Sequence, residues 1–60
     1  SHYQKFKIQP SKFVIEYELL YPEGCVIKYI LRHRLKGKKE DLKKAIHFIE
    51  MIIERDYSDV

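Results

Sequence analysis

The strongest structural signal in the chain lies in residues 40–57, which read EDLKKAIHFIEMIIERDY. Apolar residues recur there at the three- and four-residue spacing of an amphipathic helix. They are Leu42, Ala45, Ile46, Ile49, Ile52 and Ile53. Glu40 and Asp41 fall in the first turn, where acidic side chains interact favourably with the helix dipole, and Glu40 is spaced to pair with Lys44. The pattern therefore predicts a helix over 40–57.

The preceding residues predict a second helix that packs against the first. Pro22 and Glu23 suit a first turn, because proline lacks an N–H that would go unused and glutamate favours the positive end of the dipole. Apolar residues with helical spacing follow at Val26, Ile27, Ile30, Leu31 and Leu35. Gly37 then suits a helix end, since glycine accepts the left-handed conformation. We expect a helix over 22–36 and a helical hairpin with 40–57.

The first third of the chain has a mixed pattern. Residues 1–9 alternate crudely between apolar and polar, which is typical of a short strand or an arm. In residues 10–21, four apolar residues alternate with polar ones at the period of a strand. The same segment also fits a helical face, with Pro10 well placed in a first turn. The residues alone leave both interpretations open and lean slightly towards a strand.

The chain has more apolar helix surface than it can bury. Phe48, Met51 and Tyr57 widen the apolar stripe of 40–57, and a helix apolar over so much of its circumference is deeply buried or packs against other chains. A chain of 60 residues buries little surface alone. Cys25 is the only cysteine, and the three histidines are scattered, so neither a disulfide within the chain nor a metal site is expected to stabilise it. We therefore predict a homo-oligomer.

Charge is distributed unevenly along the chain. Residues 28–44 carry eight lysines and arginines against two acids, a net charge of +6, whereas residues 45–60 carry −3. A cationic block of this kind attracts phosphates and other anions. The alternative is a solvated loop with flanks kept soluble by lysine.

Several functional classes are not indicated. The two glycines begin no phosphate-binding loop, and no serine lies in a nucleophile-elbow motif. No apolar run approaches the roughly 18 residues of a membrane span, and no signal segment opens the sequence. With one free cysteine, these features favour a cytoplasmic location and no membrane partner.

One helix face offers a candidate anion site. Lys28 and Arg32 are four residues apart and share a side of the second helix, with Lys36 one turn further. The hairpin brings Lys44 to the same end, and Tyr29 beside these cations is suited to stack on a base. Together they would neutralise phosphate charge and present an aromatic platform. The alternative is ordinary surface lysines in weak pairs with acidic neighbours.

Several of these motifs together resemble a known family. Residues 23–30 read EGCVIKYI, Arg32 follows, residues 36–37 read KG, and residues 40–45 read EDLKKA. In this order and spacing they resemble a family of small phage proteins, long described as a domain of unknown function, that includes the nucleotide kinase of bacteriophage T-seven. The opening His2 and Tyr3 and the approach over 8–10 are similar too. The likeness extends from residue 2 to about residue 54.

The resemblance implies an α-helical fold, so we expect residues 10–21 to form a helix despite their strand-like alternation. The complete prediction is an all-α fold in a single domain over 1–60, with an arm at 1–9 and helices at 10–21, 22–36 and 40–57. The helical hairpin is expected to assemble into a homo-oligomeric bundle.

The resemblance also implies nucleotide binding, with phosphoryl transfer to nucleoside monophosphates as the family's activity. The implied nucleotide-binding residues are His2, Tyr3, Lys28, Tyr29, Arg32, Lys36 and Lys44. Asp41 is the candidate catalytic residue, and in a kinase Asp41 or Glu23 would orient a hydroxyl or a Mg²⁺ ion that accompanies the nucleotide. Cys25 stands where the family has asparagine, and the chain is much shorter than the family's enzyme, so we favour binding over catalysis.

Three alternatives to simple nucleotide binding stay open. One is a nucleoside monophosphate kinase without a phosphate-binding loop, which is chemically feasible because positioning and electrostatics supply most of the catalysis of phosphoryl transfer. Another is sequestration of a host signalling nucleotide in the host cell cytoplasm during infection. The third is an interaction with a host factor or nucleic acid. It is the least favoured, because the chain has no base-reading motif.

Overall fold

The computed structural model describes residues 7–58, and every regular element in this range is a helix. The helices are α1 (Pro10–Glu16), α2 (Tyr21–Arg32) and α3 (Lys38–Tyr57). The predicted all-α fold is therefore confirmed, including the helix that was chosen over a strand in the first third of the chain. None of the described helices is both long enough and apolar enough to cross a lipid bilayer.

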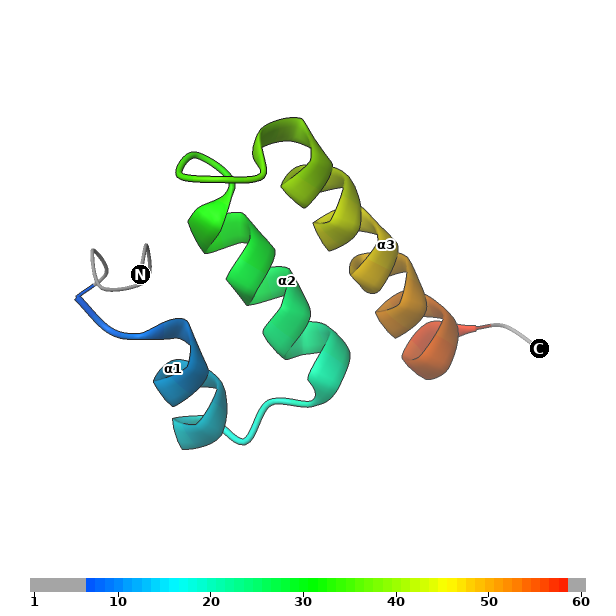
Figure 1. Cartoon of the computed structure of the whole chain (residues 1–60). Coiled ribbons are helices and arrows are strands. Elements are labelled where there is room, and N and C mark those ends of the chain that lie inside the picture. Colours follow the sequence, from blue (N-terminus) through cyan, green and yellow to red (C-terminus); the bar gives the residue numbers. More distant parts are fainter. Residues whose placement is uncertain (1–6, 59–60) are drawn as a thin grey trace.

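The three helices lie side by side in one layer. α2 and α3 form an antiparallel hairpin, and α1 packs against the side of α2 that faces away from α3 (Figure 1). The molecule measures 42 × 28 × 11 Å, so its shortest dimension is about the diameter of a single helix. α2 is the central helix, with α1 on one side and α3 on the other.

α1 ends at Glu16, five residues before the predicted end at residue 21. Glu18 adopts a left-handed conformation with φ 51°, and the N–H groups of Glu18 and Leu19 donate to the carbonyls of Ile15 and Val14. This is the Schellman arrangement that closes helices, in which glycine is the usual left-handed residue. The prediction missed this helix end because a glutamate occupies the glycine position.

α2 also ends earlier than predicted, at Arg32 instead of residue 36, and α3 begins at Lys38 instead of residue 40. Residues 33–37 form the connecting turn, in which the N–H groups of Leu35 and Lys36 both donate to the Arg32 carbonyl. Gly37 has φ −83°, so the prediction of a left-handed glycine is wrong, and the left-handed residue is Lys38 with φ 52°.

An ion pair holds the turn against α3. Arg32 donates from Nε and Nη2 to the two carboxylate oxygens of Asp41, at 2.9 and 3.0 Å, and the Gly37 N–H donates to Asp41 Oδ2 at 3.0 Å. The Asp41 side chain is only 1% exposed. A Cβ atom on Gly37 would lie 2.0 Å from the Asp41 carboxylate. Glycine is therefore required at this position to leave room for the carboxylate.

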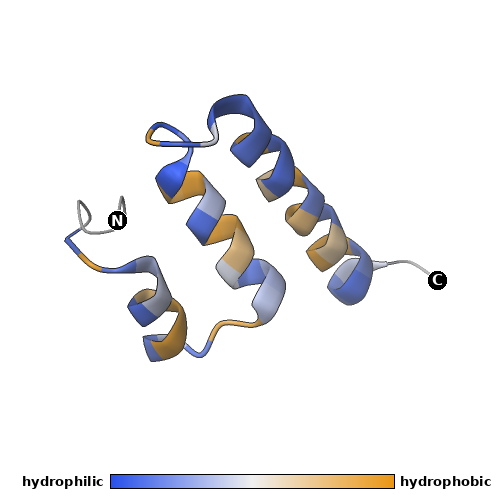
Figure 2. Ribbon diagram, in the orientation of Figure 1, coloured by the Kyte–Doolittle hydropathy of each residue, from blue (hydrophilic) through white to orange (hydrophobic). Residues whose placement is uncertain are grey.

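Little apolar surface is fully covered in a single chain. Cys25 and Ala45 are buried, but fourteen large apolar side chains of the described residues remain more than a third exposed, among them Ile46 at 56% and Ile53 at 52%. Apolar residues run along α2 and α3 between polar ones (Figure 2). A layer one helix thick has no second layer to cover them.

We expect Gly37→Ala to destabilise the fold, because the new methyl group would displace the Asp41 carboxylate from Arg32 and the turn. Overpacking of this kind costs on the order of 1–3 kcal/mol. Thermal and urea denaturation followed by circular dichroism would measure the change.

Gly24→Ala is the matched comparison. A Cβ atom there would lie 3.2 Å from the Val14 methyl carbons, a much milder contact, and alanine favours the helix. Equal stability of Gly37→Ala and the unmodified protein would contradict the structural role assigned to Gly37.

Candidate functional site

Three cations from two helices converge on one aromatic ring. The ring centroid of Tyr29 lies 4.6 Å from Lys28 Nζ, 5.0 Å from Arg32 Cζ and 5.5 Å from Lys44 Nζ. All three distances fall within the range of cation–π attraction. We call Lys28, Arg32 and Lys44 the cation cluster. The structure thus brings together four of the residues predicted to bind nucleotide.

Helix geometry and packing explain this convergence. Lys28 and Arg32 are one turn apart on α2 and flank Tyr29, while Lys44 reaches the ring from α3. The Tyr29 ring stacks on Phe48 of α3, with 6.1 Å between the centroids and 14° between the ring planes. The ring is thereby held where α2 meets α3, so a base that stacked on Tyr29 would share the ring with Phe48 and three cations.

Positive charge in the cation cluster is only partly neutralised. Asp41 pairs with Arg32, but within residues 7–58 no carboxylate lies within ion-pair distance of Lys28 or Lys44. Glu40 pairs with Lys43 at 3.7 Å and not with Lys44, so the predicted Glu40–Lys44 pair is wrong. Two ammonium groups therefore stand beside an already cationic guanidinium, an arrangement that favours an anion.

Asp41, the candidate catalytic residue, is fully engaged by the protein. The pKa of the Asp41 carboxyl is lowered mainly by the hydrogen bonds from Arg32, which outweigh the tendency of burial to raise it. The Gly37 N–H and the charge of Lys44 lower this pKa further. Both oxygens accept hydrogen bonds, and the side chain is almost inaccessible. Asp41 is therefore an ionised anchor that positions Arg32, and no oxygen faces a substrate.

Glu23, the other carboxylate expected near the phosphates, lies at the opposite end of the hairpin. It is in the first turn of α2, about 13 Å along the helix from Arg32 in the last turn. Arg55 of α3 donates from Nη2 to Glu23 Oε2 at 2.5 Å, and these hydrogen bonds lower the pKa of the Glu23 carboxyl. Arg55 also pairs with Asp56. Glu23 therefore fastens α2 to α3 and does not join the cation cluster.

The remaining predicted residues lie apart from the cluster or outside the described range. Lys36 is exposed in the turn, with no interaction with Tyr29. His2 and Tyr3 fall outside residues 7–58. Within that range, no three His, Cys, Asp or Glu side chains lie close enough together to hold a metal ion.

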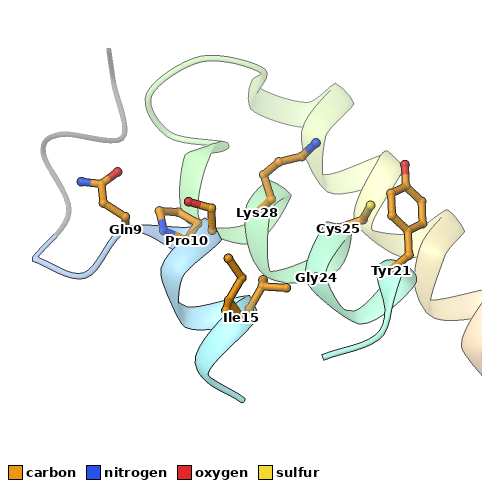
Figure 3. Close-up of a pocket in the computed structure, with 9 residues that line it drawn as sticks. Gln9, Pro10, Ile15, Tyr21, Gly24, Cys25 and Lys28 are labelled. Atoms are coloured by element: carbon orange, nitrogen blue, oxygen red, sulfur yellow. The ribbon is translucent and has the colours of Figure 1, made fainter. Parts of the chain in front are cut away.

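A pocket that the sequence did not predict adjoins the cluster. It lies between α1 and α2 and has a volume of about 350 Å³, and Lys28 is part of its lining (Figure 3). We call it the α1–α2 pocket. The available signal was Gly24, which lets the two helices approach, but the sequence did not show which face of α1 would pack there.

Comparison with known proteins places the chain in a family. No curated protein and no solved structure shows a significant match. A protein-family model described as a protein of unknown function, DUF3310, matches residues 1–50 and so includes α1, α2 and the whole cation cluster. The phage origin and the nucleotide-kinase activity implied by the resemblance stay predictions. The match covers most of the 60 residues, and the chain therefore belongs to the DUF3310 family.

Proposed function

We propose that the protein binds nucleotide phosphates on the cation cluster. The observation that carries this proposal is the convergence of Lys28, Arg32 and Lys44 on the Tyr29 ring, where Asp41 is the one carboxylate of residues 7–58 that pairs with any of the three. Phosphate oxygens form strong charge-assisted hydrogen bonds with lysine and arginine. A polyanion would also relieve the repulsion between these like charges.

The spacing of the cluster suits a chain of phosphates. The ammonium groups of Lys28 and Lys44 lie 4.6 and 5.5 Å from one centroid, so they are at most about 10 Å apart. They come from different helices, and a phosphate chain between them would bridge α2 and α3. Arg32 adds a guanidinium whose position Asp41 fixes. A nucleoside di- or triphosphate offers enough anionic oxygens to contact both lysines.

Binding without phosphoryl transfer is the form of the proposal that the carboxylates support. Transfer requires a donor and an acceptor held in line, usually with Mg²⁺ and a residue that orients the nucleophile. Near the cluster, Asp41 is engaged by Arg32 and Gly37, and the exposed Glu40 faces Lys43. Glu23 is held by Arg55 at the other end of the hairpin. Sequestration of a nucleotide needs only the cations.

We expect Lys28→Gln and Lys44→Gln each to weaken the binding of ATP or dTTP about tenfold, since a charge-assisted hydrogen bond contributes on the order of 1.5–3 kcal/mol. Isothermal titration calorimetry at low ionic strength would measure the affinities. Lys39→Gln is the matched control. It removes the same charge from the first turn of α3, where Lys39 is exposed and has no contact with Tyr29.

Equal weakening by all three substitutions would show diffuse attraction without a defined site, and would redirect attention to nucleic acid, tested across a salt series. Arg32→Ala is a less informative variant, because it would leave the buried Asp41 carboxylate without its main partner and disturb the fold.

We expect no multiple-turnover phosphoryl transfer when the protein is incubated with ATP or dTTP, Mg²⁺ and each nucleoside monophosphate. Anion-exchange chromatography would resolve any diphosphate that forms. Turnover by the unmodified protein that disappears in Lys28→Gln and persists in Lys39→Gln would instead establish a kinase.

We also propose that the protein acts as a homo-oligomer. In a layer 11 Å thick, fourteen large apolar side chains of the described residues remain more than a third exposed, most of them on the hairpin. Monomeric proteins rarely expose apolar surface so extensively. A second copy presents the same apolar faces and is therefore a suitable cover.

Light scattering at micromolar concentration should give a mass above that of one chain, 7.3 kDa. Ile53 is 52% exposed in a single chain, so Ile53→Asp would be tolerated by a monomer but should dissociate an oligomer that buries it. A folded monomer for the unmodified protein would contradict this proposal and leave the proposed phosphate site intact.

A further inference from the structure

The α1–α2 pocket has a largely apolar wall. Pro10, Val14 and Ile15 line it from α1, and Tyr21, Gly24 and Cys25 line it from α2 (Figure 3). Its volume of about 350 Å³ falls within the range of small-molecule sites. It is open enough to admit a ligand, because Ile15 and Tyr21 are each 75% exposed.

Two helix stripes build this pocket. On α2, Tyr21, Cys25 and Lys28 follow one another at four- and three-residue spacing and therefore share a face. Gly24 has no side chain on that face, which brings the Val14 methyl groups close to the α2 backbone and forms the floor. Pro10 is buried at the start of α1. These features form a mainly apolar pocket between two helices.

Lys28 connects the pocket with the cation cluster. It is the one charged side chain among the described residues that line the pocket, and its Nζ lies 4.6 Å from the Tyr29 centroid. In Figure 3 the Lys28 side chain carries its amino group away from Pro10 and Ile15. The apolar α1–α2 pocket thus lies beside a member of the cation cluster.

We propose that the α1–α2 pocket receives the base of the nucleotide whose phosphates lie on the cation cluster. This inference rests on the proposed function. The Tyr29 ring is already in contact with Phe48 and three cations, whereas the pocket offers mainly apolar surface on which a heteroaromatic ring can be buried. The ligand class is therefore a nucleoside di- or triphosphate. Inorganic polyphosphate has no base, so it would contact the cations and leave the pocket empty.

Polar groups at the pocket are suited to contact the edge of a base. The Ser11 hydroxyl and the Gln9 side-chain amide belong to lining residues, as does the Tyr21 hydroxyl, which is hydrogen-bonded with the Cys25 thiol. A few polar groups in a mainly apolar wall are typical of sites that orient a small molecule.

The only thiol in the chain reports on this pocket. Cys25 lines it, is 6% exposed and forms no disulfide. The rate of Cys25 alkylation by N-ethylmaleimide would be measured with ATP, dTTP or inorganic tripolyphosphate, each at a concentration that raises Tm equally. Matching the Tm shifts removes the general effect of stabilisation. We expect at least one nucleotide to slow alkylation about fivefold more than tripolyphosphate, because a base would block the pocket directly.

Two matched truncations test the apolar wall. Ile15 and Ile8 are both exposed isoleucines, but only Ile15 lines the pocket. Ile15→Ala should lower, about fivefold, the affinity for the nucleotide that protects Cys25. The affinity for tripolyphosphate should be unchanged, because the substitution removes apolar surface that only a base would touch. Ile8→Ala should alter neither affinity.

Three results would overturn the inference. If nucleotides bind and depend on Lys28 but protect Cys25 no better than tripolyphosphate, the base lies elsewhere and the proposed function stands. If the thiol is inaccessible without ligand and Ile15→Ala alters the mass in solution but not nucleotide affinity, a second copy covers the pocket. If neither nucleotide nor tripolyphosphate binds, the proposed function and the inference fail together.

Discussion

The ion pair between Arg32 and Asp41 is the interaction on which the rest of the hairpin depends. A carboxylate with 1% exposure is tolerated only when it is paired and fully hydrogen-bonded, and Arg32 and the Gly37 N–H meet that requirement. The pair fixes where the chain turns after α2, requires glycine at residue 37 and orients α3 beside α2. It also sets the position of the guanidinium that faces Tyr29.

The same pair shapes the electrostatics of the candidate site. It engages Asp41, and no other carboxylate of residues 7–58 lies within ion-pair distance of Lys28 or Lys44. Like charges held this close repel one another, and attraction to the Tyr29 ring offsets part of that cost. Because the three cations lie on packed helices and already meet at Tyr29, an anion would need little rearrangement of the backbone to bind, which would reduce the entropic cost of binding.

The sequence predicted the hairpin and the cation cluster because both follow from helical spacing. Leu42 to Ile53 specify α3, and the four-residue step from Lys28 to Arg32 gives one face of α2. Contacts between helices were harder to predict from the sequence. Asp41 was predicted to face a ligand, but it turns towards Arg32, nine residues earlier, and only the packing of α3 on α2 determines that choice. Glu18 at a left-handed position hid the end of α1 for a similar reason: its residue type does not indicate its conformation.

The place of α2 in the layer connects the two halves of the proposed site. α1 contributes apolar side chains on one side of α2, and α3 contributes Lys44 and Phe48 on the other, so neither neighbour forms the site alone. Lys28 is common to both halves. An amphiphilic anion laid across α2 would contact all three helices, and the short α1, whose main contacts are with α2, has the most contact surface to gain. Nucleotide binding would then stabilise α1 in particular, because a ligand that binds only the folded arrangement shifts the equilibrium towards it.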